Sequence, residues 1–435
     1  MSSSPSAPTR AARVGFWLYA GHLLTIWGIA LANVFLGLLL LWTAWRRRLG
    51  DWSAFRRQDG ARAVWLATGA LAVLYLLSTL LSLDPARSAS ELGDLLAWST
   101  FALAPVWVAG EERARRLVVL FLGLATLLAL HGVAQYLWTD LGGLHDRIIG
   151  LFSHYQTFAG VLLIGFLAAV ARVATGRRDP WTWVAVGLLT VCLLLTLTRG
   201  AWVAAVATVL GLALARARHR PARSAAVVAL IVAAIGLLVT VGPGSWRERI
   251  RSIGDLSDLS NYDRLCMIEA AGYMVAERPL FGIGPEMVAE RYPIYRHPTA
   301  PRVTTPHLHN AFVSRAAELG LLTSIAYLIW IGALVALAWR GYRAEGGRHG
   351  PRADLWLATL LVAVGFNIAG LFEDNWRDTE VRRAALFLLA LPLCLNAERS
   401  RSTTPESLVA TSSAERDPVW ETRDDRLDAP TSDTR

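Results

Sequence analysis

Apolar runs of roughly 20 residues recur along the whole chain, and this feature constrains the fold more than any other. A helix of that length crosses the hydrocarbon core of a bilayer. Of the 435 residues, 54% are hydrophobic and only 18% are charged, a combination that is rare in soluble domains. The first run, Val14–Trp45, is too long for one untilted span and is interrupted at 28–33, which predicts two short helices. The other predicted spans are residues 63–83, 95–109, 117–137, 158–173, 181–197, 202–215, 225–241, 311–337, 355–372 and 384–395. We therefore expect an all-α polytopic membrane protein with about 12 transmembrane helices.

The loops between these runs alternate in their content of arginine. Arginine-rich loops are expected in the cytoplasm. The remaining loops are poor in arginine or balanced by acids and are expected on the external side. This alternation puts both chain termini in the cytoplasm. Since the basic residues lie in short clusters between spans, the net charge of +9 does not indicate nucleic-acid binding. The arginine-rich loops are residues 46–62, 111–116, 172–178, 216–223 and 340–352.

This pattern predicts four parts: N-terminal transmembrane helices (1–241), a periplasmic loop with short helices (242–310), C-terminal transmembrane helices (311–395) and a disordered cytoplasmic tail (396–435). A cleavable signal peptide within the first apolar run is an alternative for the N-terminus. The three cysteines, Cys192, Cys266 and Cys394, are widely spaced and form neither a disulfide framework nor a metal-binding pattern.

The external loop, 242–310, is the only large element outside the membrane apart from the tail, so we look there for chemistry. It should contain a helix over 261–278, with Asn261 and Asp263 as capping residues and Arg264 in the first turn. An arginine there opposes the helix dipole and gains nothing locally, which makes it a candidate for binding an anion. A surface ion pair is the alternative. The following "LFGIGPE" is predicted to be a Gly/Pro turn, because a lone G-x-G is a weak phosphate signal.

Two further stretches on the same predicted side place polar groups beside apolar runs. In "LTLTRGAW", Arg199 is a candidate for paired hydrogen bonds to phosphate, and an interfacial arginine is the alternative. In "PHLHN", His307 and His309 can exchange protons near neutral pH, or they and Asn310 are interfacial helix caps. Arg302 is a further candidate for substrate binding.

Other polar groups receive structural interpretations. The segment "FEDNWRDTEVRR" at 372–383 is expected to form salt bridges within itself, with acceptor binding as the alternative. His131 lies in an apolar run and is interpreted as a buried core histidine. Arg315 and Glu318 are spaced i and i+3 and are expected to pair. The chain has no HExxH or Walker motif, so no metal site is predicted.

Several motifs together resemble the bacterial O-antigen ligases and the related O-antigen polymerases. They are "HNAFVSRAAELG", the Arg199-Gly200 pair that opens a helix, "RPLFGIGPE" after the loop helix, and "GLFSHYQTFAG" at 150–160, where Gln156 occupies the amide position. The resemblance covers roughly residues 60–395. Thr323 stands where the ligase signature has a second glycine, a departure that concerns the ligase branch and not the superfamily.

The resemblance implies a glycosyltransferase of the C type in the bacterial inner membrane that needs neither metal nor cofactor and acts in lipopolysaccharide biosynthesis. Its donor would be a glycan on undecaprenyl diphosphate, and its acceptor a sugar hydroxyl of lipid A-core at the periplasmic face. We expect Arg199 and Arg264 to hold the diphosphate and His309 to act as base or as a diphosphate ligand. Asn310, His307 and Arg302 would contact substrate.

Three alternatives stay open. An O-antigen polymerase would use a lipid-linked glycan as acceptor, and a protein-glycosylating enzyme would use a protein. A transporter of polysaccharide or lipid would show repeated halves, and the sequence contains no internal repeat.

Overall fold

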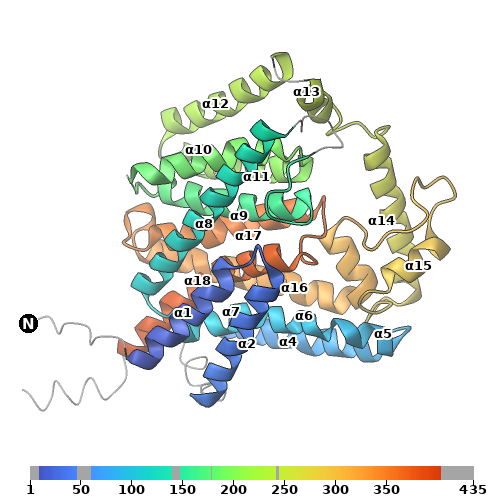
Figure 1. The fold of residues 1–435 in the computed structure, drawn as a ribbon, viewed down its shortest axis with the longest axis horizontal. Coiled ribbons are helices and arrows are strands. Elements are labelled where there is room, and N and C mark those ends of the chain that lie inside the picture. The colour runs from blue at the N-terminus through green and yellow to red at the C-terminus, as the bar shows by residue number, and fades with distance from the viewer. Residues whose placement is uncertain (1–8, 47–59, 140–146, 178, 242–243, 403–435) are drawn as a thin grey trace, which may run out of the picture.

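The computed structural model describes residues 9–46, 60–139, 147–177, 179–241 and 244–402, and these residues form helices without any strand (Figure 1). The predicted tail 396–435 lies outside the described residues except for its first seven, which continue the last helix to Ser402. The α-helices are α1 (Arg10–Leu24), α2 (Ile29–Trp45), α4 (Arg62–Leu80), α5 (Pro85–Ala89), α6 (Gly93–Ala97), α7 (Ser99–Trp107), α8 (Glu111–Trp138), α9 (Tyr155–Ala174), α10 (Pro180–Leu195), α11 (Arg199–Ala217), α12 (Pro221–Thr240), α13 (Gly244–Arg251), α14 (Leu259–Glu277), α15 (Val288–Tyr295), α16 (Ala311–Ala344), α17 (Ala353–Gly370) and α18 (Thr379–Ser402).

Seven helices in the described part of the chain are long and apolar enough to cross a bilayer: α4, α8, α9, α11, α12, α16 and α17. The helices α2 and α10 are apolar but shorter. The protein is therefore a multi-pass membrane protein, as predicted, while the number of about 12 spans stays a prediction. The division of the first apolar run into two helices is confirmed, but the break lies at residues 25–28 instead of 28–33, because α2 already begins at Ile29. The predicted span 95–109 is instead two short helices, α6 and α7, joined by a tight turn at Trp98.

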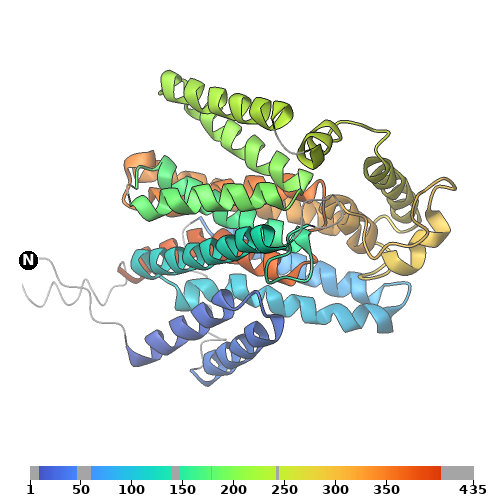
Figure 2. The ribbon, with the colours of Figure 1, turned by 45° about the horizontal axis from the view of Figure 1, so that its top comes forward.

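The helices run in roughly one direction, with α13, α14 and α15 gathered at one end of the bundle (Figure 2). α9 packs against α17, α16 against α4, and α18 against α7. α9 and α17 are buried on almost all sides, which suits helices that are hydrophobic around their whole circumference. α12 lies at the outside of the bundle and buries little of its surface against other helices (Figure 1).

The turn that follows α14 interlocks with a break in α16. At Gly320 the backbone leaves the helical conformation, with φ 81°. The backbone groups that lose their helical partners pair with the turn. The amide of Ile283 donates to the carbonyl of Ala317 at 2.9 Å, and the amide of Leu321 donates to the carbonyl of Pro279 at 2.8 Å. A side chain at Gly282, where φ is 73°, would lie 2.3 Å from the carbonyl oxygen of Glu318. The prediction that "LFGIGPE" is a turn is confirmed, and its glycines allow two backbones to meet closely.

Candidate active site

A cavity of about 410 Å³ lies at the end of the bundle where α9, α11 and α14 begin and α17 ends. It brings together five of the six residues singled out in the sequence as catalytic or substrate-binding, from segments more than 100 residues apart. The sixth, Asn310, is not part of its lining. The titratable groups that line the cavity are Arg147, His154, Tyr155, Arg199, Arg249, Asp263, Arg264, Arg302, His307, His309, Glu373 and Asp378.

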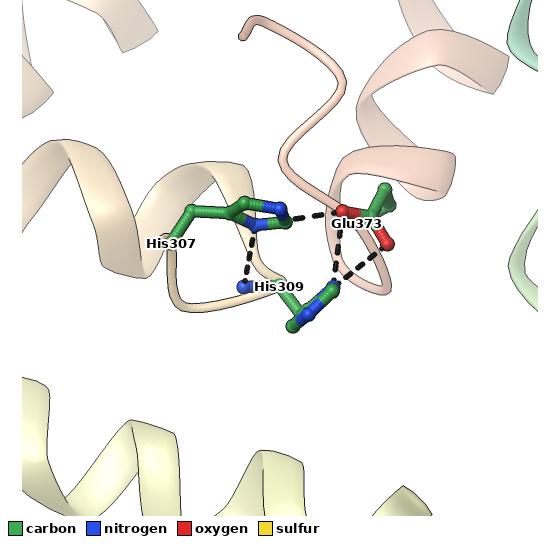
Figure 3. A group of neighbouring side chains, drawn as sticks. All are labelled: His307, His309 and Glu373. Atoms are coloured by element: carbon green, nitrogen blue, oxygen red, sulfur yellow. Dashed lines mark hydrogen bonds and ion pairs between the residues drawn. The ribbon is translucent and has the colours of Figure 1, made fainter. Parts of the chain in front are cut away.

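His309 and Glu373 form a hydrogen-bonded pair in this cavity (Figure 3). The Nδ1 atom of His309 lies 2.9 and 3.1 Å from the two carboxylate oxygens of Glu373, which follows α17. The Nε2 atom lies 2.9 Å from Nη1 of Arg302. Since a guanidinium can only donate, Nε2 accepts this hydrogen bond and the imidazole proton sits on Nδ1, facing Glu373. His309 also has φ 49°, a left-handed conformation that L-residues adopt rarely and that often marks functional sites.

His307 completes this cluster as a neutral imidazole. Its Nδ1 accepts a hydrogen bond from the backbone amide of His309 at 3.3 Å (Figure 3). Burial lowers the pKa of His307 to about 4, against the opposing influence of Glu373. Burial alone would raise the pKa of Glu373, but the hydrogen bond with His309 and the charge of Arg264 outweigh it and lower the pKa. At neutral pH the cluster therefore holds one carboxylate and a neutral His307.

Arg264 lies further along its helix than the sequence indicated. α14 begins at Leu259, and its N-cap is Asp258, whose side chain accepts from the amide of Asn261. Arg264 therefore falls in the second turn, and the predicted cap at Asn261 or Asp263 and the dipole argument are wrong. Within the described residues, the guanidinium of Arg264 has no hydrogen-bond or ion-pair partner, so the predicted surface ion pair is absent. Burial lowers the pKa of Arg264, while Glu373 opposes this shift.

Arg199 and Arg302 are each bound by an acid near the start of α14. Both Nη atoms of the buried Arg199 contact Asp258, at 3.1 and 3.2 Å, and Nη1 donates to the carbonyl of Ser252 at 2.8 Å. The Nε atom of Arg302 lies 3.1 Å from Asp263. Arg199 thus ties the start of α11 to the start of α14, in addition to facing the cavity. Arg302 is half exposed and connects α14 to His309.

Asn310 is the N-cap of α16. Its side-chain oxygen accepts from the amides of Phe312 and Val313, at 3.0 and 3.1 Å, and its side-chain nitrogen donates to the carbonyl of Leu371. The capping interpretation is confirmed. Because Asn310 is held in this way, it fixes the backbone that follows His309 and also joins α16 to the end of α17.

Sequence reasoning missed several groups in the cavity. Glu373 was assigned to internal salt bridging of 372–383, but that segment bonds to other parts of the chain, such as Arg377 to Glu286 and Arg382 to Asp94. Arg147 and Arg249 also line the cavity, and burial together with neighbouring arginines lowers the pKa of Arg249 to about 10. The one signal in the sequence that pointed to Glu373 was the density of charged residues at 372–383, between two apolar runs.

Two other interpretations are wrong. His131 is exposed on α8 instead of buried in the core. Arg315 does not pair with Glu318: its guanidinium lies 3.7 Å from the centroid of the Tyr327 ring, and Glu318 faces Arg377 at 3.6 Å. The i and i+3 spacing permits a pair within the helix, but aromatic and charged partners on other elements compete for both side chains.

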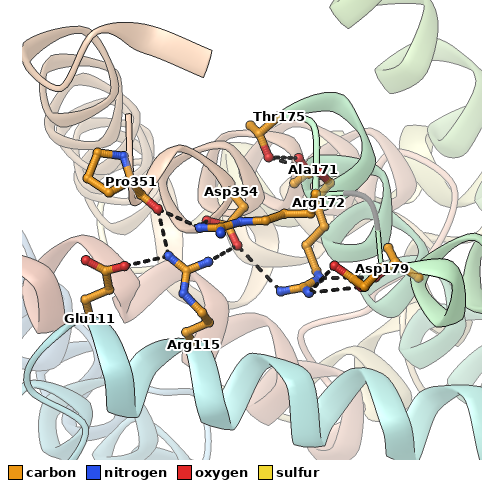
Figure 4. A network of polar contacts seen from close by, with 10 residues as sticks. Glu111, Arg115, Ala171, Arg172, Thr175, Asp179, Pro351 and Asp354 are labelled. Atoms are coloured by element: carbon orange, nitrogen blue, oxygen red, sulfur yellow. Dashed lines mark hydrogen bonds and ion pairs between the residues drawn. The ribbon is translucent and has the colours of Figure 1, made fainter. Parts of the chain in front are cut away.

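A second polar cluster lies at the opposite ends of the same helices and has a structural role. Asp354, at the start of α17 and 1% exposed, lies 2.5 Å from Arg115 of α8 and 3.3 Å from Arg177 (Figure 4). Arg172 of α9 faces the same carboxylate at 3.5 Å and also binds Asp179. These contacts hold three helices together around one buried carboxylate, whose charge is compensated by its arginine neighbours.

His307, His309 and Glu373 each offer one ligand atom, and these three atoms lie within 4.8 Å of one another. Such a set could hold a metal ion. Two features of this set oppose it: Nδ1 of His309 already donates to Glu373, and Nε2 faces a guanidinium. The five arginines of the cavity also outnumber its three carboxylates, which favours an anion over a cation.

No curated protein matches this chain. The model of one family, described as O-antigen ligase, matches residues 184–328, a segment that contains Arg199, Arg264, His309 and the break at Gly320. The match is narrower than the resemblance at 60–395, but it includes the residues that line the cavity from α11, α14 and the segment before α16. Over these residues, the chain is similar to the O-antigen ligase family.

Proposed function

We propose that the protein transfers a glycan from undecaprenyl diphosphate to a sugar hydroxyl at the periplasmic face of the bacterial inner membrane. The observation that carries this proposal is one cavity in which a histidine with a carboxylate partner faces a group of arginines. Members of the family are glycosyltransferase-like enzymes that act on lipid-linked glycans. The cavity lies at the end of the bundle that carries α13–α15, which is the segment predicted to face the periplasm.

The arginines would bind the diphosphate. Arg264 is the foremost candidate, because its guanidinium lies in the cavity lining and lacks a hydrogen-bond partner among the described residues. Arg199 adds positive charge, although its contacts with Asp258 leave fewer donors for a ligand. Guanidinium groups can contact phosphate oxygens in pairs, and such contacts supply charge stabilisation without a metal ion. This suits a donor whose leaving group is a lipid diphosphate.

His309 would act as the base. Its Nε2 lone pair points toward Arg302, and a hydroxyl of the acceptor sugar would take that place when Arg302 turns toward the diphosphate. Nε2 removes the hydroxyl proton while the oxygen attacks the anomeric carbon, and the bond from that carbon to the phosphate oxygen breaks. The electron pair leaves with the lipid diphosphate, whose added negative charge the arginines stabilise. Direct displacement inverts the anomeric carbon.

Glu373 would hold the proton of His309 on Nδ1 and stabilise the imidazolium that forms. His307 and Asn310 support this geometry through the backbone on either side of His309. Asp378, also in the lining, has its pKa raised to about 7 by burial and by the charge of Glu373. Near neutral pH it would be protonated in about half of the molecules, which reduces the negative charge beside the donor.

The proposal is tested with purified protein in lipid vesicles, a glycan on undecaprenyl diphosphate as donor and lipid A-core as acceptor. Arg264→Ala and His309→Ala should each lower transfer by about 10²-fold or more. The matched controls are Arg247→Ala, an exposed arginine of α13, and His131→Ala on α8, and both should retain wild-type transfer. Transfer within a few-fold of wild type by either cavity variant contradicts the assignment.

The acceptor separates a ligase from a polymerase. Replacing lipid A-core with a second lipid-linked glycan in the same assay tests the alternative. Transfer to lipid A-core supports the ligase, whereas extension of the lipid-linked glycan alone supports a polymerase that uses the same donor site.

A further inference from the structure

A second cavity, of about 460 Å³, shares a wall with the first. The loop between α17 and α18 supplies that wall: Glu373 and Asn375 line the first cavity, and Asp374 and Trp376 line the second. Its other walls come from α4, α6 and the start of α16. The volume falls within the range of about 300–1,000 Å³ that is typical of small-molecule sites.

Aromatic rings form one side of this second cavity. Trp98 and Trp376 are stacked with an interplanar angle of 4° and centroids 5.6 Å apart. Tyr327 stands perpendicular to Trp376, at 89° and 5.6 Å. Trp98 is only half-buried, so part of its indole is accessible from the cavity. Flat aromatic surfaces of this kind pack against the C–H face of a sugar ring.

Buried polar atoms without partners lie among these rings. Within the described residues, Oε1 of Glu318 and Nε of Arg382 accept or donate no hydrogen bond, although neither residue is more than 8% exposed. The nearest charge to Glu318 is Arg377 at 3.6 Å, beyond hydrogen-bond distance. The Nη1 atom of Arg315 is also without a hydrogen bond in this part of the chain. Such groups are destabilising unless a ligand or solvent satisfies them.

The two cavities differ in the balance of their acidic and basic side chains. Five acidic side chains and three arginines line the second cavity, whereas five arginines and three acidic side chains line the first. A diphosphate is therefore disfavoured in the second cavity. A metal cation is disfavoured as well, because Arg377 and Arg382 are already bound to the acids that would ligate it. A neutral ring with many hydroxyl groups can both donate to Glu318 and accept from Arg382.

We propose that the second cavity is a sugar-binding subsite that holds a neutral hexose ring of the acceptor glycan, with Trp98 as its stacking platform and Glu318 and Arg382 as its hydrogen-bonding partners. The common wall would then present the acceptor to the cavity that contains His309 and the diphosphate. This inference rests on the proposed function for the identity of the acceptor, but sugar binding itself can be measured without any transfer.

Binding is tested by saturation-transfer NMR on the full-length protein in nanodiscs, with methyl glucoside, methyl galactoside and methyl mannoside as probes. The wild type should give saturation transfer to at least one probe. Trp98→Ala and the isosteric Glu318→Gln should abolish it. Trp138→Ala, an 84% exposed tryptophan of α8, and Glu290→Gln, on α15 outside both cavities, should not. His309→Ala should bind the probes normally, so loss of transfer and loss of sugar binding are distinguishable.

The KM values for the two substrates then show whether the bound sugar belongs to the acceptor or to the donor. In Glu318→Gln and Trp98→Phe, the KM for acceptor should rise about tenfold while the KM for donor stays within about twofold of wild type. A rise in the KM for donor alone overturns the acceptor assignment. Absence of probe binding by a folded wild type overturns the subsite altogether and leaves the proposed transfer reaction intact. If Trp98→Ala does not fold, Glu318→Gln and Trp98→Phe carry the same test.

Discussion

Replacing Glu373 with glutamine should keep His309 in place but change which of its ring nitrogens carries the proton. In the wild type, the carboxylate can only accept, so the proton of the imidazole stays on Nδ1 at 2.9 Å from Glu373, and Nε2 keeps the lone pair that would take the hydroxyl proton. In Glu373→Gln, the new side-chain amide can instead donate to Nδ1. That arrangement moves the imidazole proton to Nε2 and blocks the proposed base.

The magnitude follows from the charge that is lost. An imidazolium and a carboxylate about 4 Å apart attract each other by ~4 kcal/mol at an effective dielectric constant of about 20. Since the imidazolium is only partly formed in the transition state, we take about half of this, ~2 kcal/mol, as the smallest effect. A loss of ~2 kcal/mol lowers kcat by about 30-fold, and the wrong tautomer of His309 lowers it further. We therefore expect kcat for Glu373→Gln to fall by about 30- to 1,000-fold.

The assay is glycan transfer in vesicles with donor and acceptor varied separately. We expect kcat to fall while both KM values change little, because Glu373 would act through its hydrogen bond to His309. Nitrogen-15 NMR of histidine-labelled protein should show loss of the Nδ1–H signal of His309. Glu290→Gln, an exposed carboxylate of α15, is the control. A kcat within about threefold of wild type, with the NMR signal of His309 changed, refutes the reasoning.

Three further predictions concern stability. Because the pKa of His307 is lowered from 6.5 to about 4, only the unfolded chain binds this proton between those pH values, so folding stability decreases by ~3 kcal/mol as pH falls through that window. The thermal midpoint of His307→Gln should depend less on pH over the same range. Asp354→Asn should destabilise by about 3–5 kcal/mol, measured by thermal unfolding, while transfer per folded molecule is retained. Gly320→Ala should lower the thermal midpoint, because its Cβ would lie 2.2 Å from the carbonyl of Leu280 at φ 81°, whereas Gly332→Ala in the same helix, which meets nothing within 4 Å, should not.

The membrane-spanning helices could be predicted from the sequence because their signal is local. An apolar run long enough to cross a bilayer must be helical, since its backbone polar groups have no other partners there. The break between α1 and α2 and the cap at Asn310 were predictable for the same reason, as each depends on residues within a few positions. His309 also stood out locally, as a titratable group beside an apolar run. Arg264 was singled out by a dipole argument that its place in the second turn of α14 contradicts.

The partners of these residues depend on tertiary structure. Glu373 lies 64 positions from His309 and reads in sequence as one of several charges between two helices. Glu318 has an arginine at helical spacing, yet it faces Arg377. Periodicity and hydropathy describe which side of a helix is apolar, but they carry no information about which helix lies opposite. That choice depends on how whole surfaces pack, and here it brought the arginines, the imidazole and the carboxylate into one cavity.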